Sequence, residues 1–294
     1  MDLVVLENEH GAATISPRAG ASLRSLRIRN NAGEFELLSG GDQPPDPTLL
    51  PRGHGSFIMA PWPNRIRDGR LVALDGEHIL PVNSGLHAIH GTVRQREWTV
   101  TNVAPDCASM EVELEEPWPY GGRVIYEAAL DGPALRQSLT IEVAEGQPEM
   151  PAGFGWHPWF RRNLGKGDVH VKADVEAMWV LDEDVTPTGE VLVSEETERL
   201  REGARLVDSE MDGCFRLQPN GSATLRWPEA ALQIESSGEV SHLMVYSPEH
   251  AICMEPQTCT VNAFQLAARG IEGTGAASAA PGSPLQGWTR WSWK

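Results

Sequence analysis

Five short segments, far apart in the chain, each join a hydrogen-bonding or titratable side chain to a rigid neighbour. They are Pro61-Trp62-Pro63-Asn64-Arg65-Ile66, His87-Ala88-Ile89-His90-Gly91, Gly155-Trp156-His157-Pro158-Trp159-Phe160, Met211-Asp212-Gly213-Cys214-Phe215 and Glu255-Pro256-Gln257-Thr258. Loops and strand ends commonly carry function on a rigid scaffold. We therefore expect folding to bring these segments together around one small polar ligand.

Two of these residues, His157 and Glu255, could transfer protons. A histidine near its ordinary pKa of about 6.5 can donate or accept a proton at neutral pH. Glu255 follows the apolar stretch 251–254, and partial burial there would raise its pKa toward that of a general base. Either residue alone could equally be structural, so the hypothesis depends on their occurring together.

Other side chains in these segments could bind a ligand or a metal. The guanidinium of Arg65 could donate to ligand hydroxyls, although an ion pair with Asp68 is the alternative. His87 and His90 could ligate a metal together with His157. No thiolate pair or known metal motif accompanies them, so we expect neither a metal site nor a cofactor.

Alternating apolar and polar residues recur along the chain and indicate half-buried antiparallel strands. The clearest examples are residues 111–115, 139–143 and 169–172, with shorter ones at 225–227 and 291–293. Gly (29) and Pro (22) interrupt the chain often, so residues 194–206 are the only predicted helix. Short sequential strands with frequent turns predict an all-β protein, a β-sandwich or barrel.

Two segments read as linkers. Residues 40–47 contain three prolines in four positions, which predicts an extended loop. Residues 273–284 are rich in Gly, Ala, Ser and Pro and predict a mobile surface loop before the last strand. Neither divides the composition into halves, so we expect one domain over residues 1–294.

The charge balance excludes some partners. The 294 residues carry a formal charge of −17, which would repel a nucleic acid or an anionic membrane. No spanning apolar stretch or signal peptide is visible. The cysteines (Cys107, Cys214, Cys253, Cys259) form no paired motif, which favours free thiols in a reducing cytoplasm. We expect a small-molecule ligand, and a monomer or a homodimer.

The ordered motifs resemble the aldose 1-epimerase (galactose mutarotase) family. The order is Asn-Arg-Ile, His-Gly, His-Pro-aromatic-Phe, Asp-x-x-Phe and Glu-Pro-Gln-Thr. The first motif is similar to that of a bacterial branch with Pro-Trp-Pro-Asn-Arg-Ile. The resemblance runs from Ala60 to the terminal Trp-Thr-Arg-Trp-Ser-Trp segment. It implies a large antiparallel β-sandwich (the galactose mutarotase-like supersandwich), a cofactor-free mutarotase and a sugar site across one sheet.

The resemblance also implies roles for individual residues. Glu255 matches the family's general base and His157 its general acid. The substrate-binding residues matched are Asn64, Arg65, His90 and Asp212. Two departures are visible: Thr92 follows His90-Gly91 where the family commonly has a second glycine, and Arg161-Arg162 replaces the usual Asn-Leu.

These roles imply a mechanism for interconverting the α and β anomers of a hexose. Glu255 takes the C1 hydroxyl proton while protonated His157 donates to the ring oxygen. Rotation about C1–C2 and reclosure on the other face give the other anomer. His90 and Arg65 hold the ring and offset charge on oxygen.

Two other functions remain open from the sequence. One is a sugar-binding or regulatory module on the same fold without turnover. The other is a glycoside hydrolase or lyase using Glu255 and Asp212 as paired carboxylates, although an essential histidine is unusual there.

The substrate is also open, between a neutral hexose and a hexose with a 6-phosphate or 6-sulfonate. Arginines near the motifs motivate the anionic sugar, since guanidinium groups bind such oxyanions well. They are Arg67, Arg70, Arg94, Arg96, Arg161 and Arg162. The alternative is that they pair with the abundant surface acids. Strand alternation predicts that either Arg161 or Arg162 points toward the ligand.

Overall fold

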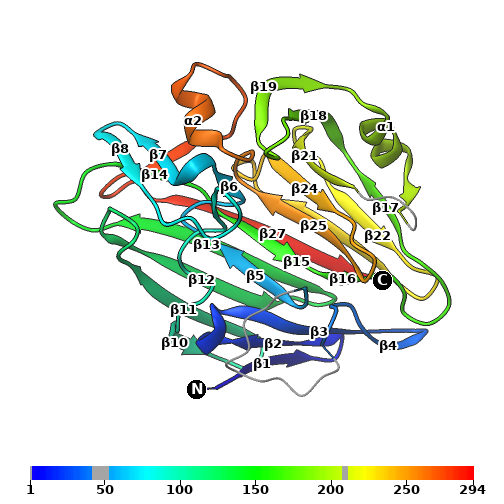
Figure 1. The fold of residues 1–294 in the computed structure, drawn as a ribbon. Coiled ribbons are helices and arrows are strands. Elements are labelled where there is room, and N and C mark those ends of the chain that lie inside the picture. Colours follow the sequence, from blue (N-terminus) through cyan, green and yellow to red (C-terminus); the bar gives the residue numbers. More distant parts are fainter. Residues whose placement is uncertain (1, 42–52, 207–210) are drawn as a thin grey trace.

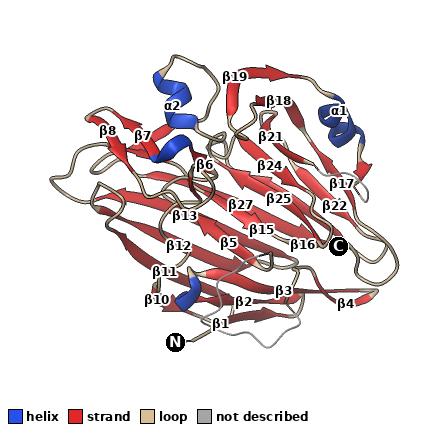
Figure 2. Cartoon of the chain, in the orientation of Figure 1, coloured by secondary structure: helices blue, strands red, loops and turns tan. Residues whose placement is uncertain are grey.

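The computed structural model describes residues 2–41, 53–206 and 211–294. Regular structure in these ranges is predominantly extended, and Figure 2 shows few and short helical pieces beside large sheets. Neighbouring strands of both large sheets run antiparallel. The prediction of a mostly β, antiparallel protein is therefore confirmed.

The larger sheet has twelve strands, ten of which follow one path from β1 to β19. In path order these are β1 (Val4–Asn8), β2 (Gly11–Ser16), β3 (Ser22–Asn30), β5 (Ser56–Met59), β15 (Gly155–Pro158), β25 (Ala251–Gln257), β24 (His242–Tyr246), β21 (Asp212–Leu217), β18 (Val175–Leu181) and β19 (Pro187–Leu192). Off this path, β4 (Gly33–Glu36) pairs with β3, and β16 (Phe160–Arg161) pairs with β25.

The second sheet has nine strands and includes the five segments predicted from alternation. In path order these are β10 (Thr99–Val103), β11 (Cys107–Leu114), β12 (Gly122–Leu130), β13 (Ala134–Val143), β27 (Leu285–Trp293), β23 (Ala231–Ser236), β22 (Ala223–Arg226), β17 (His170–Ala173) and β20 (Ala204–Arg205). The last strand of the chain, β27, lies in the middle of this sheet, between β13 and β23 (Figure 1).

One hydrophobic core includes side chains from both large sheets. Strand periodicity explains it, because alternate residues of each strand point to the same face. In β12, for example, Val124 and Tyr126 are buried while Glu127 is exposed. Phe160 of the larger sheet meets Trp291 of the nine-stranded sheet edge to face, with ring centroids 5.3 Å apart. The two sheets are thus the layers of a sandwich.

Three small two-stranded sheets complete the described strands. They pair β6 (Arg65–Ile66) with β9 (Ala88–Ile89), β7 (Arg70–Ala73) with β8 (Gly76–Ile79), and β14 (Met150–Ala152) with β26 (Ala277–Ala279). The 3₁₀ turns η1 (Pro17–Ala19) and η2 (Arg67–Gly69) precede β3 and β7. Figure 1 places the β7–β8 hairpin beside α2 (Ala263–Ala268).

The helix expected over residues 194–206 is present as α1 (Glu195–Glu202). Ser194 caps it, since its hydroxyl accepts from the Thr197 amide and the Thr197 hydroxyl accepts from the Ser194 amide. The expectation of a single helix was wrong, because α2 also forms. None of the helices in the described ranges has the length and apolar character needed to cross a membrane.

The two linker predictions fared differently. Most of residues 40–47 lie outside the described residues. The prediction of a mobile loop over residues 273–284 was wrong, because β26 lies within it and pairs with β14. Gly275 adopts a positive φ of 71°, and a Cβ there would lie 2.3 Å from the Thr258 carbonyl oxygen. Small residues are therefore needed here for close packing, which composition alone cannot distinguish from mobility.

Candidate active site

The central residues of the site lie in one cross-strand row of the larger sheet. Phe57 pairs with His157, and Glu255 pairs with Met244. Gly155 pairs with Gln257, so the antiparallel register places His157 opposite Glu255. The neighbouring residues Trp156 and Met254 belong to the sandwich core, so strand alternation directs His157 and Glu255 to the other face of the sheet.

On that face, His157 and Glu255 form a buried pair. The Nε2 atom of His157 lies 3.2 Å from Oε1 of Glu255, and the side chains are 8% and 2% exposed. Within the described part of the chain, His157 Nδ1 and Glu255 Oε2 have no hydrogen-bond partner. Buried polar atoms are normally satisfied. These two unpaired polar atoms therefore indicate a place where a polar ligand or water binds.

Aromatic rings fix the orientation of the His157 imidazole. Trp159 stacks on it at a centroid distance of 5.1 Å and an interplanar angle of 12°. Phe57 lies against it at 4.5 Å, and His90 meets it edge-on at 5.2 Å. His250 continues the stack on Trp159, with centroids 5.4 Å apart. Trp159, which comes from the same segment as His157, therefore helps to hold its ring in place.

Arg65 begins β6 of the small β6–β9 sheet, and Asn64 and His90 directly adjoin the paired ends of β6 and β9. The His90 amide donates to the Asn64 carbonyl oxygen at 2.9 Å, and Arg65 Nη1 donates to Asn64 Oδ1 at 3.2 Å. Asn64 and His90 both have positive φ values, 51° and 64°. Such backbone conformations are uncommon for residues other than glycine and concentrate at functional sites.

Gly91 packs closely against the backbone of Ala60, which lies just before this small sheet in the chain. Its φ is 68°, and a Cβ there would lie 1.8 Å from the Ala60 carbonyl oxygen. The Thr92 amide donates to that same oxygen at 2.9 Å. The glycine after His90 is therefore required by close backbone approach, whereas Thr92 takes the place of the family's second glycine without disturbing it.

The charges around Glu255 connect it to Asp212 and Arg65. Burial raises the pKa of Glu255 well above its ordinary value; the Asp212 charge raises it further, and the Arg65 charge lowers it. Burial also raises the pKa of Asp212, and Arg65 again opposes the shift. All three side chains consequently act on one another, as expected if they surround one ligand.

The pKa of His157 is shifted downward, in contrast to that of Glu255. Burial lowers its pKa to about 3, and the nearby Arg94 guanidinium contributes to the decrease. The pKa of His90 is also lowered well below its ordinary value, by burial and then by His157, Arg94 and Arg65. At neutral pH both imidazoles are thus neutral. The mechanism implied by the sequence needs a protonated His157, so its lowered pKa means that the proton must reach His157 from another group in the site.

Five of the six arginines proposed for an anionic sugar make the following ion pairs and hydrogen bonds. Arg67 pairs with Asp182 and Asp184, Arg70 with Glu77, and Arg96 with Glu115. Arg161 Nε donates to the Leu38 carbonyl, and Arg162 donates to the carbonyls of Leu206, Ser247 and Pro248.

The prediction that Arg161 or Arg162 points toward the ligand is therefore not supported by their contacts. Buried carbonyl groups need donors, and these guanidinium groups supply them. Arg94 is the arginine of the six whose charge lowers the pKa of His157 and His90. It also lies over the Phe57 ring at 5.6 Å.

The group of potential metal ligands in the structure differs from the three histidines considered from the sequence. His87 lies apart from the pair, because its Nε2 contacts the Asp184 carbonyl oxygen at 3.0 Å. Cys253 instead joins His157 and Glu255, and the potential ligand atoms of the three lie within 4.8 Å of one another. The four cysteines are free. The sequence analysis did not select Cys253, although its position two residues before Glu255 in a strand could have indicated that both side chains share one face.

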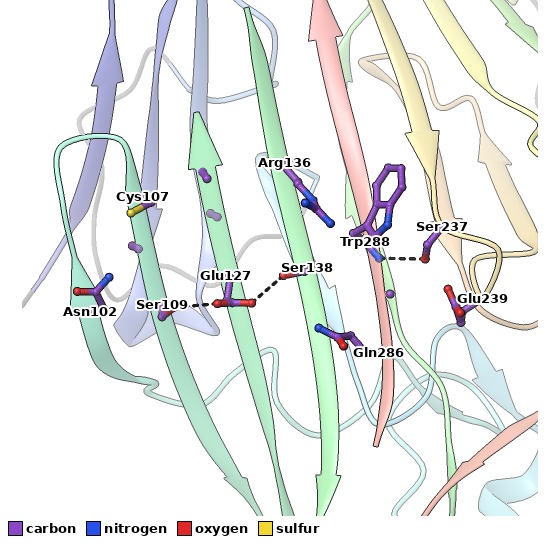
Figure 3. Close-up of a pocket in the computed structure, with 14 residues that line it drawn as sticks. Asn102, Cys107, Ser109, Glu127, Arg136, Ser138, Ser237, Glu239, Gln286 and Trp288 are labelled. Atoms are coloured by element: carbon purple, nitrogen blue, oxygen red, sulfur yellow. Dashed lines mark hydrogen bonds between the residues drawn. The ribbon is translucent and has the colours of Figure 1, made fainter. Parts of the chain in front are cut away.

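A separate concave region lies on the nine-stranded sheet and has a volume of about 580 Å³. Figure 3 shows Glu127, Arg136 and Trp288 on its floor, contributed by β12, β13 and β27. Glu127 accepts from Ser138 at 3.1 Å, and Arg136 stacks on Trp288 at 5.2 Å. None of the predicted site residues lines this region.

Comparisons with known proteins find relatives that are similar in sequence or in fold. A protein of Escherichia coli (strain K12), YihR, described as uncharacterized, is 24% identical over 277 residues, covering 88% of each chain. A galactose mutarotase-like protein from Clostridium acetobutylicum superposes with a TM-score of 0.83 at 20% identity, covering 99% of this chain and 94% of that one.

A GalM/aldose epimerase homologue from C. elegans also has a TM-score of 0.83, at 16% identity and 99% and 98% coverage. These likenesses establish the fold as galactose mutarotase-like. The family model described as aldose 1-epimerase matches residues 2–282. The chain therefore belongs to the aldose 1-epimerase family.

Proposed function

We propose that this protein is an aldose 1-epimerase that interconverts the α and β anomers of a hexose by acid–base ring opening and reclosure. The single observation that carries the proposal is the buried His157–Glu255 pair, 3.2 Å apart, with an unpartnered oxygen and nitrogen among the described atoms. Mutarotation needs one group that gives a proton and one that takes a proton at the same time. The pair supplies both.

His157 and Glu255 together hold one dissociable proton. Between the low pKa of His157 and the raised pKa of Glu255, the carboxyl holds a proton and the imidazole is neutral. Moving that proton to His157 gives a carboxylate and an imidazolium without exchange with solvent. Glu255 then takes the C1 hydroxyl proton, and His157 donates to the ring oxygen. Reclosure on the other face returns both protons.

The remaining site residues bind and orient the sugar. Arg65 and His90 contact the ring hydroxyls and offset charge that develops on oxygen, while Asn64 positions Arg65. Asp212 accepts from a sugar hydroxyl and, through its charge, keeps the Glu255 pKa raised. No cofactor is needed, so prolonged chelation is expected to leave the rate unchanged or higher.

The substrate is a neutral hexose or one with an anionic 6-substituent. Arg94 is the residue through which an anionic group would be selected, because its charge reaches the His90–His157 side of the site. We also place the chain in the branch with Pro61-Trp62-Pro63-Asn64-Arg65-Ile66, as one domain over residues 1–294. The shared core of both sheets supports the single domain. The free cysteines support a cytoplasmic location.

The test is a polarimetric or NMR anomerisation assay with glucose, galactose and hexoses bearing a 6-phosphate or 6-sulfonate. Faster equilibration of at least one freshly dissolved anomer supports the proposal. Sugar binding without acceleration for any member would favour the non-catalytic binding module. Hydrolysis of a glycoside without anomerisation would favour the paired carboxylates Glu255 and Asp212.

A further inference from the structure

Cys253 lies beside the acid–base pair on the same strand. It precedes Glu255 by two residues in β25, so both side chains leave the same face of the sheet. The potential ligand atoms of His157, Cys253 and Glu255 all lie within 4.8 Å of one another, and all three residues are buried. A nitrogen, a sulfur and an oxygen donor therefore converge at one point.

The spacing of these donors suits a tetrahedral cation. With Zn–N and Zn–O bonds of about 2.0–2.2 Å, two ligand atoms of a tetrahedral zinc ion lie about 3.3 Å apart. His157 Nε2 and Glu255 Oε1 are 3.2 Å apart. With a Zn–S bond of about 2.3 Å, the Sγ atom needs to lie about 3.6 Å from both. The potential ligand atoms all lie within 4.8 Å of one another, so each distance to Sγ has to shorten by no more than about 1.2 Å.

The charges near the three donors both attract and repel a divalent cation. A thiolate and a carboxylate together balance a charge of two, and Asp212 lies close enough to act on both Glu255 and Cys253. Arg65, Arg94 and Arg162 oppose the cation, since each acts on one of the three donors. Binding of the ion must displace the Cys253 thiol proton, so affinity should strengthen as pH rises.

We propose that His157, Cys253 and Glu255 form an inhibitory site for a thiophilic divalent cation such as Zn²⁺. Three protein ligands leave a fourth position for water or a sugar hydroxyl. The bound cation occupies the nitrogen and oxygen that proton transfer requires, so it competes with turnover. The inhibition rests on the proposed function, whereas binding of the ion does not.

Direct binding is measured first, by calorimetry with Zn²⁺ and by the thiolate-to-metal absorption band of Co²⁺ on the intact chain. We expect one ion per chain for the wild type. Removal of a residue that only hydrogen-bonds to a metal ligand typically lowers metal affinity about 10–100-fold. Because Cys253 is proposed as a ligand itself, Cys253→Ala should lower the affinity at least about 100-fold. Cys253→Ser preserves the shape of the side chain and guards against misfolding. Cys107→Ala removes a thiol elsewhere and should bind like the wild type.

Inhibition is measured second, with each variant's own metal-free rate as its reference. Zn²⁺ should slow anomerisation by the wild type and by Cys107→Ala, reversibly on chelation, and much less by the Cys253 variants. Absence of binding, or equal binding by the Cys253 variants, would overturn the cation site. Intact binding in a protein whose metal-free form shows no anomerisation would support the site and overturn the proposed function.

Discussion

His157 Nε2 and Glu255 Oε1 lie 3.2 Å apart in a buried part of the larger sheet, and their pKa values are shifted in opposite directions. Burial disfavours the charged form of each, so the free protein holds one proton on the pair over a wide pH range. The pair is thereby kept in the state that has both a proton to give and a site to take one.

The first prediction is that kcat/KM follows a bell-shaped pH profile whose acid limb lies well below the ordinary pKa of histidine. As pH falls through the pKa of His157, near 3, a second proton binds and the accepting site is lost. As pH rises through the raised pKa of Glu255, the remaining proton is lost. Because kcat/KM reports the free enzyme, an acid limb near the ordinary histidine value of about 6.5 would contradict this protonation state.

The second prediction concerns Arg94. Its charge lowers the pKa of His157, so Arg94→Met should move the acid limb of kcat/KM to higher pH. Arg96→Met is the matched control, because Arg96 is paired with Glu115 and the Glu113 carbonyl. Equal profiles for the two variants would show that Arg94 does not act on the pair. If the substrate is anionic, Arg94→Met should also raise its KM more than that of glucose.

The third prediction is that Arg162 stabilises the fold and does not select the sugar. Its three donors reach the carbonyls of Leu206, Ser247 and Pro248 at 2.7–2.9 Å. Hydrogen bonds to charged groups contribute about 1.5–3 kcal/mol, so Arg162→Met should lower the free energy of unfolding by at least that amount in urea titrations.

The control for Arg162 is Arg290→Met, which removes a partly exposed pair with Glu235 at 3.8 Å. Exposed pairs contribute about 0–1 kcal/mol. A selective rise in KM for anionic sugars in Arg162→Met, with stability unchanged, would restore the original expectation for this residue.

The fourth prediction compares two glycines with positive φ. Gly91→Ala places a methyl group 1.8 Å from the Ala60 carbonyl oxygen, whereas Gly132→Ala meets no atom within 4 Å. Both should incur the backbone cost of about 1–2 kcal/mol. Only Gly91→Ala should be further destabilised and lose turnover, since the adjacent His90 would move. Equal melting temperatures for the two variants would show that the close approach at Gly91 is not needed.

Much of the fold could be predicted from the sequence, because strands with one buried face alternate visibly. Helix α2 was missed since its N-cap, Asn262, has a left-handed φ of 58° and no side-chain cap. The six-residue helix therefore lacks both a start signal and length. The β26 strand was missed because the small residues of 273–284 are typical both of mobile loops and of closely packed strand pairs.

The motifs grouped residues that the structure also brings close together, but the sequence could not give their pKa shifts. Asn64, Arg65, His90, His157, Asp212 and Glu255 were selected from motif order, and contacts or charge effects link them in the structure. The protonation of His157 depends on burial by Phe57 and Trp159, which the sequence does not quantify. Alternation predicts that Arg161 or Arg162 points toward the ligand, but it cannot reveal the backbone carbonyl groups to which both donate hydrogen bonds.

The most direct test of the central claim is the anomerisation rate of Glu255→Gln, followed by NMR for a sugar that the wild type converts. The amide keeps the size of the side chain but cannot take the C1 proton. We predict a fall in kcat of at least about 100-fold, with the sugar still binding at close to the wild-type Kd. Near-wild-type turnover by Glu255→Gln would contradict the account.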